Sequence, residues 1–238
     1  MSASAAEPGG QPRDARDARA CARRVSTADS WRGPRSAAPS AHETMHKGRL
    51  EAFSDGVLAI IITIMVLELR VPQGMDLAAL RPLAPVFLSY ILSFTNIGIY
   101  WNNHHHLFQL VKRVNGGVLW ANLHLLFWLS LMPFATAWMG ENHFAAAPTA
   151  LYGVDLFACG MAYYILERTL IAQDGPASLV ATAIGREVKG MISVVCYLIA
   201  IPSAFIAPWI AWSMYILVAA IWLVPDRRAV RALERSEK

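Results

Sequence analysis

The sequence places ionisable side chains inside or beside strongly apolar runs, where such groups either do chemistry or hold helices together. Arg49 stands just before the apolar run 53–69, Asp55 lies near the start of that run, and Asp155 lies within another. A charge at the centre of a membrane span costs about 2.5–3.5 kcal/mol, and less near the end of the span. Each of these groups therefore needs a polar partner or a functional role.

The run 53–69 is predicted to be a helix with two different faces. At 100° per residue, one stripe about 100° wide is aliphatic except for a single hydroxyl group, and its members are Ile60, Thr63, Ile64 and Leu67. Asp55 lies about 140° from Ile60, so it is expected to point away from this stripe and into a neighbouring helix. Taken alone, the stripe is better explained by contact with lipid or another helix than by a function.

Residues 104–106 are three consecutive histidines, which raises the question of a metal site. Consecutive helical residues point 100° apart, so the three side chains do not converge on one ion as residues i and i+4 do. No acidic residue or cysteine lies nearby in the sequence. A hydrogen-bonding cluster at the membrane interface is the better interpretation, and the sequence predicts neither a metal site nor a cofactor.

The composition places these groups in a membrane protein. Hydrophobic residues make up 55% of the chain and charged residues 16%, whereas a soluble domain carries about 25% charged residues. Nine of the 21 Lys and Arg residues fall in residues 1–49 and five in residues 226–238, so only seven remain for the 176 residues between them. A soluble enzyme is excluded, and no nucleic-acid partner is predicted.

Six apolar runs approach the length of about 20 residues that a helix needs to cross the hydrocarbon core. They are 53–69, 84–101, 116–139, 147–166, 190–206 and 209–224. The last two form one uncharged stretch that is too long for a single crossing, and Pro208 predicts a tight turn between them. The predicted fold is therefore an all-α integral membrane protein with six transmembrane helices per chain.

The basic residues predict the orientation of these spans. Nineteen of the 21 Lys and Arg residues fall on one side, and only Arg70 and Arg81 fall on the other. By the positive-inside rule, both termini are predicted to be cytoplasmic. Residues 1–44 are predicted to be a disordered basic tail, residues 45–225 the six-helix domain and residues 226–238 a short basic tail. Whether translation starts at Met1 or Met45 stays open.

The first three runs carry a pattern that resembles the transmembrane protein 175 family of potassium channels, whose members occur in endosomes and lysosomes of animals and in bacteria. The first-helix signature of that family is similar to Arg49-x-x-x-Phe53-Ser54-Asp55 followed by Gly-x-x-Ala-Ile-x-x-Thr. The resemblance continues through Trp101-x-x-His104-His105 in the second run and through Asn122 and Leu131-x-Pro133-Phe134 in the third. The last three runs match mainly in hydropathy and number.

The resemblance implies that the first span lines an ion pore. Ile60 would form a narrow apolar constriction, Ile64 and Leu67 would form further ones, and Thr63 would contribute to potassium selectivity. A structural polar network would hold this helix in place, and its members would be Arg49, Phe53, Ser54, Asp55, Trp101 and His104. No Thr-Val-Gly-Tyr-Gly carbonyl filter occurs in the chain, so selectivity would arise from a hydroxyl beside an apolar neck that can gate by dewetting.

The predicted function is a potassium-permeable cation channel of the bacterial plasma membrane, with potassium as the permeant ion and no catalysis. One first-span helix cannot enclose a pore, and the resemblance implies a homotetramer embedded in the lipid bilayer. A proton-coupled secondary transporter with Asp55, His104 and Asp155 as a relay is the alternative, although the two halves share no repeat. A membrane hydrolase is the weaker rival, because no Ser-His-Asp arrangement is recognisable and the stretch His42-Glu43-x-x-His46 lies before the first apolar run. For Asp155, an interhelical partner is favoured over a polar pathway.

Overall fold

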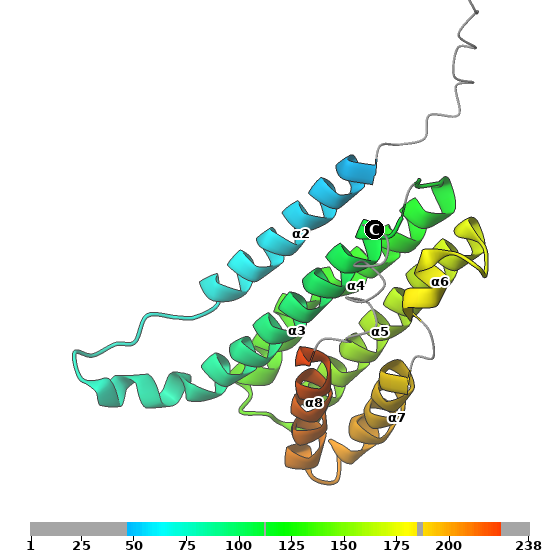
Figure 1. Ribbon diagram of the computed structural model, residues 1–238. Coiled ribbons are helices and arrows are strands. Elements are labelled where there is room, and N and C mark those ends of the chain that lie inside the picture. The colour runs from blue at the N-terminus through cyan, green and yellow to red at the C-terminus, as the bar shows by residue number, and fades with distance from the viewer. Residues whose placement is uncertain (1–46, 112, 185–187, 225–238) are drawn as a thin grey trace, which may run out of the picture. The chain divides into compact units, whose positions relative to one another are not determined.

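The computed structural model describes residues 47–111, 113–184 and 188–224, which are helical apart from the connections between helices (Figure 1). In chain order the elements are α2 (Lys47–Leu67), the 3-10 helix η2 (Leu77–Leu83), α3 (Ala84–Gln109), α4 (Gly116–Glu141), α5 (Ala146–Asp174), α6 (Leu179–Ile184), α7 (Val188–Ser203) and α8 (Pro208–Leu223). The all-α prediction is confirmed. The two predicted tails and the candidate start at Met45 lie outside the described residues.

Among the described residues, four helical segments are long and apolar enough to cross a membrane. They are α2, the continuous segment Leu77–Gln109, α4 and α5. The helices α7 and α8 are also apolar, but each has only 16 residues. A helix of that length spans about 24 Å, which is less than the thickness of about 30 Å of the hydrocarbon core.

The break between α7 and α8 falls where the sequence predicts a turn. The helix α7 ends at Ser203, and α8 begins at Pro208. Proline suits the first position of a helix because the N–H that it lacks would have no partner there. The two apolar runs at the end of the chain are therefore two helices, as expected from their length.

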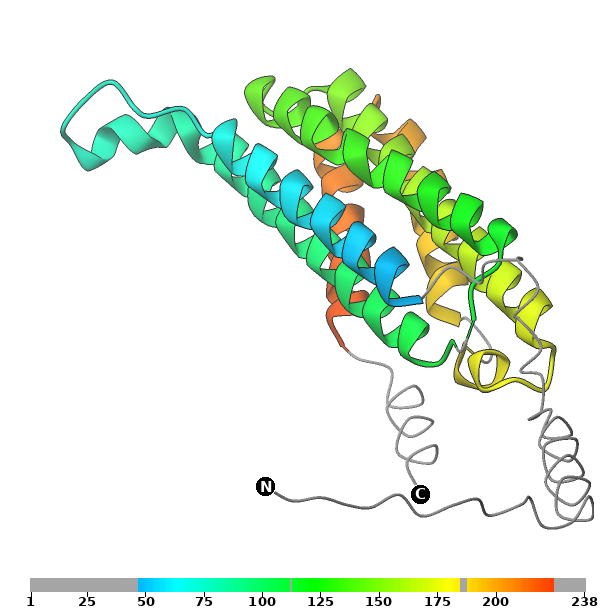
Figure 2. The same ribbon diagram turned by 90° about the horizontal axis from the view of Figure 1, so that it is seen from above.

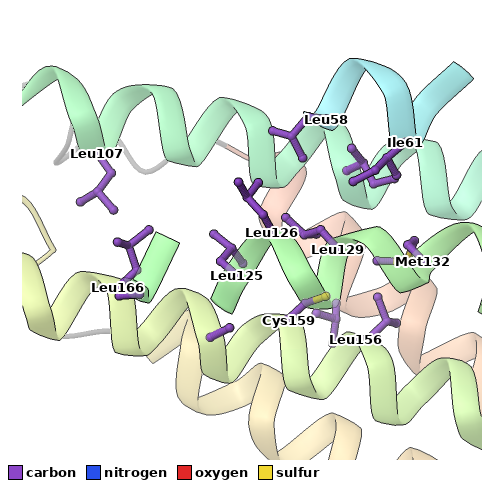
Figure 3. Packing of buried hydrophobic residues seen from close by; sticks show 14 of the residues in the cluster. Leu58, Ile61, Leu107, Leu125, Leu126, Leu129, Met132, Leu156, Cys159 and Leu166 are labelled. Atoms are coloured by element: carbon purple, nitrogen blue, oxygen red, sulfur yellow. The ribbon is translucent and has the colours of Figure 1, made fainter. Parts of the chain in front are cut away.

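The helices α4 and α5 form the centre of the packing. The helix α2 packs against α3 and α4, while α7 packs against α5 and α8. In Figure 2, α2 (blue) runs beside α3. A close view of the core shows Leu125 and Leu129 of α4 facing Leu156 and Cys159 of α5, with Leu58 of α2 on the opposite side of α4 (Figure 3). The pore candidate α2 thus lies on an outer side of the α4–α5 pair.

A glycine allows α8 to approach α5 closely. A Cβ atom at Gly153 of α5 would overlap the side chain of Tyr215 of α8. Tyr215 is fully buried and donates a hydrogen bond from its hydroxyl to the carbonyl oxygen of Thr149, at 3.1 Å. The large side chain on α8 therefore fills the space that the missing side chain on α5 leaves free.

Candidate pore helix and its polar anchor

One face of α2 is used for packing within the chain. Its buried residues recur at helical spacing on the side that contacts α3 and α4, and they are Leu50, Ser54, Leu58, Ile61 and Met65. All but Ser54 are apolar, so close van der Waals packing against α3 and α4 holds the helix in place within the membrane. This leaves the rest of α2 available for other contacts.

The other face of α2 carries the four predicted pore residues, and all four side chains are exposed in the single chain. The exposed fraction is 58% for Ile60, 42% for Ile64 and 78% for Leu67. Large aliphatic side chains exposed in one continuous stripe require either lipid or another protein surface. The structure brings these residues together on one side of α2 and leaves them unused by the fold of one chain.

Thr63 presents a specific chemical group in this stripe. Its Oγ1 donates a hydrogen bond to the carbonyl oxygen of Ile60, one turn earlier, at 2.9 Å. Because the hydroxyl proton is engaged by the backbone, the oxygen offers lone pairs to its other neighbours. A hydroxyl in this state is suited to contact a cation.

Behind this stripe, a buried hydrogen-bonded cluster joins α2, α3 and α4 through Asn122. The Nδ2 atom of Asn122 donates to Ser54 Oγ at 2.9 Å, and Ser54 in turn donates to the Leu50 carbonyl oxygen. The Asn122 Oδ1 atom lies 2.8 Å from His104 Nε2, so the histidine donates this bond. All three polar side chains are buried, and we call Ser54, Asn122 and His104 the polar anchor.

A second contact between α2 and α3 lies at the surface of the chain. Trp101 donates from Nε1 to Asp55 Oδ1 at 3.0 Å. The ring of His105 stacks on Trp101 with 6.0 Å between the centroids, and Gln109 Nε2 lies 2.9 Å from His105 Nε2. Asp55 thus contacts α3, on the side of α2 away from the exposed stripe.

The residues of the predicted polar network therefore fall into separate groups. Ser54 and His104 belong to the polar anchor, whereas Asp55 and Trp101 form their own contact. Arg49 and Phe53 are exposed, and in the part of the chain that the structure describes no ion pair or hydrogen bond connects them to either group.

Asn122 is the residue of the polar anchor whose hydrogen-bonding role the sequence did not indicate. Its central position depends on the register of three helices, which composition and periodicity do not specify. The signal available in the sequence was a carboxamide in the middle of an otherwise apolar run, since a buried amide needs hydrogen-bond partners.

The three consecutive histidines contact different neighbours. His104 bonds to Asn122 on α4, while His105 faces Trp101 and Gln109 on its own helix. Among the residues that the structure describes, no group of three or more His, Cys, Asp or Glu side chains is arranged to hold a metal ion.

Asp155 is buried in α5, apart from the polar anchor. Its exposed fraction is 5%, and neither carboxyl oxygen has a hydrogen-bond partner among the described residues. The interhelical partner that the sequence favoured for this residue is therefore not found in the described ranges.

The helical membrane fold and the signature on its first helix define a class of ion channels, and comparison with known proteins identifies the family. The family model described as "Endosomal/lysosomal potassium channel TMEM175" matches residues 49–133. The chain is 58% identical over 192 residues to a potassium channel of Chryseobacterium sp. (strain P1-3), covering 81% of this chain and 100% of that protein. This protein therefore belongs to the TMEM175 family.

Other relatives are matched over smaller parts of their length. The chain is 40% identical over 110 residues to a potassium channel of Chamaesiphon minutus, covering 44% of this chain and 53% of that protein. It is 40% identical over 84 residues to the human endosomal/lysosomal proton channel TMEM175, covering 17% of that protein. The crystal structure of a lysosomal potassium-selective channel TMEM175 homologue from Chamaesiphon minutus matches with a TM-score of 0.65 and 30% identity, covering 78% of this chain and 97% of that chain.

Proposed function

We propose that this protein is a potassium-permeable cation channel whose pore forms where the α2 helices of several copies meet. The observation that carries the proposal is the exposed stripe on α2, which is apolar except for Thr63. The relatives named as potassium channels support the choice of ion. Potassium is the permeant ion, and neither a cofactor nor catalysis is part of the function.

Ile60, Ile64 and Leu67 supply the apolar gate in this proposal. Equivalent side chains from several copies would form rings around the axis, one turn apart along α2. An ion loses hydration in such a ring and gains little from protein dipoles, so the barrier depends on the radius and polarity of the neck. A ring that water enters only when it widens can open and close the pore.

Thr63 supplies the selectivity in this proposal. Because its hydroxyl proton is held by the Ile60 carbonyl, its oxygen faces an ion with lone pairs. A ring of hydroxyl oxygens could replace part of the hydration shell of a potassium ion. This contact would discriminate among cations without the backbone carbonyls of other potassium channels.

The proposed assembly is a cyclic homotetramer in the bacterial plasma membrane, with both termini cytoplasmic and six crossings per chain. A single α2 helix cannot enclose an ion path, and a closed ring of copies can. The charge distribution supports the orientation, since 19 of the 21 Lys and Arg residues fall on the side of the termini. The short helices α7 and α8 could cross with local thinning of the bilayer.

The test is a measurement of ion selectivity on the purified protein in a planar bilayer, with potassium on one side and sodium on the other. We expect single-channel currents that reverse near the potassium equilibrium potential. Saturable, proton-coupled flux without single-channel currents would contradict the proposal and support the alternative of a secondary transporter.

A further inference from the structure

Asp155 is an acid without a compensating group. It lies in the first half of α5, its side chain is buried, and both carboxyl oxygens lack hydrogen-bond partners among the described residues. Buried polar groups in proteins are nearly always hydrogen-bonded, so each exception calls for an explanation. An ionisable residue within a membrane span is by default a candidate for function.

The groups around Asp155 cannot neutralise a negative charge. The titratable side chains within electrostatic range are Tyr100 on α3 and Tyr152 and Cys159 on α5 itself. On the side of α4, the neighbouring residue Leu156 packs among apolar side chains such as Leu129 (Figure 3). In the described ranges, no Lys, Arg or His forms an ion pair with Asp155.

The hydroxyl groups of Tyr152 and Ser93 are engaged with each other and with further partners. The Tyr152 hydroxyl lies 3.0 Å from Ser93 Oγ and accepts a hydrogen bond from Asn96 Nδ2 at 3.4 Å. Ser93 Oγ also lies 2.6 Å from Thr136 Oγ1. These bonds form a buried cluster that joins α3, α4 and α5 without including Asp155. An ionised carboxylate would therefore stand next to a polar cluster with neither a counter-charge nor a donor.

A cavity lies beside Tyr100, one of the side chains that interact electrostatically with Asp155. It lies between α3, α5, α7 and α8, has a volume of about 70 Å³ and is lined in part by Asn96, Tyr100, Asn103 and Ser193. These side chains place amide and hydroxyl groups in a lining that is otherwise largely apolar, and a buried water molecule needs such polar partners. Tyr100 both lines the cavity and lies within electrostatic range of Asp155. Tyr100 is therefore shared by the cavity and the surroundings of Asp155, although Asp155 itself does not line the cavity.

We propose that Asp155 is a proton-binding site, and that its bound proton allows α5 to pack against α3 and α4. The physical reason is that the neutral acid avoids the cost of burying an unpaired charge. The site lies apart from the pore stripe of α2 and from the polar anchor, so it stands independently of the proposed channel function. Its ligand is a single proton, exchanged through the cavity beside Tyr100.

Infrared difference spectroscopy tests the occupancy of the site directly. A protonated carboxylic acid has a C=O stretching band that a carboxylate lacks, and this band shifts in heavy water. We expect the purified parent protein at neutral pH to show such a band and Asp155→Asn to lose it. The control is Asp76→Asn, at the exposed N-cap position of η2, which should keep the band. If the parent and Asp155→Asn give the same spectrum in this region, the proposal is wrong.

The pH dependence of thermal stability provides a second readout that does not depend on channel activity. If the folded protein holds a proton that the unfolded chain has released, its stability falls as the pH rises, by up to a factor of ten in the folding equilibrium per pH unit. We expect the parent to lose thermal stability towards alkaline pH. Asp155→Asn has no such proton to release, so it should lose less thermal stability over the same pH range. Parallel pH profiles for the two proteins would overturn the proposal.

Discussion

At the scale of single residues, Asn122 joins α2 to the rest of the chain through buried hydrogen bonds. It is fully buried and bonds to side chains from two other helices, Ser54 and His104. The ion pair found among the described residues, between Arg70 and Glu141 at 3.0 Å, is by contrast exposed, and exposed pairs contribute little to stability.

Replacing Asn122 should therefore destabilise the chain. In Asn122→Leu, the His104 Nε2–H group loses its acceptor and stays buried, which costs about 1–3 kcal/mol. We expect a lower unfolding temperature in detergent, followed by the loss of monodisperse protein in gel filtration. Asn102→Ala on the exposed side of α3 is the control and should behave as the parent. Equal stability of both variants would show that the anchor does not hold α2.

Two substitutions at Thr63 distinguish the effect of its hydroxyl group on selectivity from the effect of side-chain volume. Thr63→Val has nearly the same volume but lacks the oxygen, whereas Thr63→Ser keeps the oxygen. A hydrogen-bond-like contact is worth about 1 kcal/mol, or about a fivefold change in a permeability ratio. We expect Thr63→Val to lower the potassium-to-sodium permeability ratio by at least this factor, measured from reversal potentials. Thr63→Ser should stay near the parent, and a loss of selectivity in both variants would point to packing instead of the hydroxyl.

At the scale of elements, the sequence predicted the number and order of the main helices better than their ends. The second apolar run stops at Trp101, yet α3 continues to Gln109, and the fourth stops at Leu166, yet α5 continues to Asp174. Hydropathy reports the hydrocarbon thickness, whereas the backbone hydrogen bonds continue into the polar interface. The break before Pro208 could be predicted because it depends on local chemistry.

The pairing of side chains across helices could not be predicted in the same way. That Asn122 meets both Ser54 and His104 depends on the relative rotation and register of α2, α3 and α4. The periodicity of one helix carries no information on its neighbours. It does specify that Asp55 and the stripe of Ile60 lie on different sides of α2, because both belong to the same helix.

The close approach of α8 to α5 gives a prediction for an element contact. A Cβ atom at Gly153 would overlap the Tyr215 side chain, so Gly153→Ala should lower the free energy of unfolding by about 1–3 kcal/mol through overpacking. Gly98→Ala is the matched control, since nothing lies within 4 Å of a Cβ atom built there. Thermal unfolding of both variants measures the effect. If Gly153→Ala is as stable as Gly98→Ala, the contact between Gly153 on α5 and Tyr215 on α8 is not as close as the structure indicates.

At the scale of the whole molecule, the proposed channel function depends on surfaces that one chain leaves exposed. The fold buries one face of α2 and leaves the face with Ile60 open, although burial of such a face would stabilise a single chain. In the proposed assembly these faces would meet around an axis and form the ion path, and the copies would be held together by van der Waals packing between helices. The proposed channel therefore requires that the stripe faces the axis of the assembly and not the lipid.

Single-channel recording of Ile60→Asn beside the parent tests this point most directly. If Ile60 forms a dry ring on the pore axis, the carboxamide should hydrate the neck, raise the unit conductance and weaken discrimination among monovalent cations. The control Leu198→Asn changes an exposed apolar residue on α7, away from α2, and should leave both quantities unchanged. Unchanged conductance and unchanged selectivity in Ile60→Asn would contradict the assignment of α2 as the pore helix.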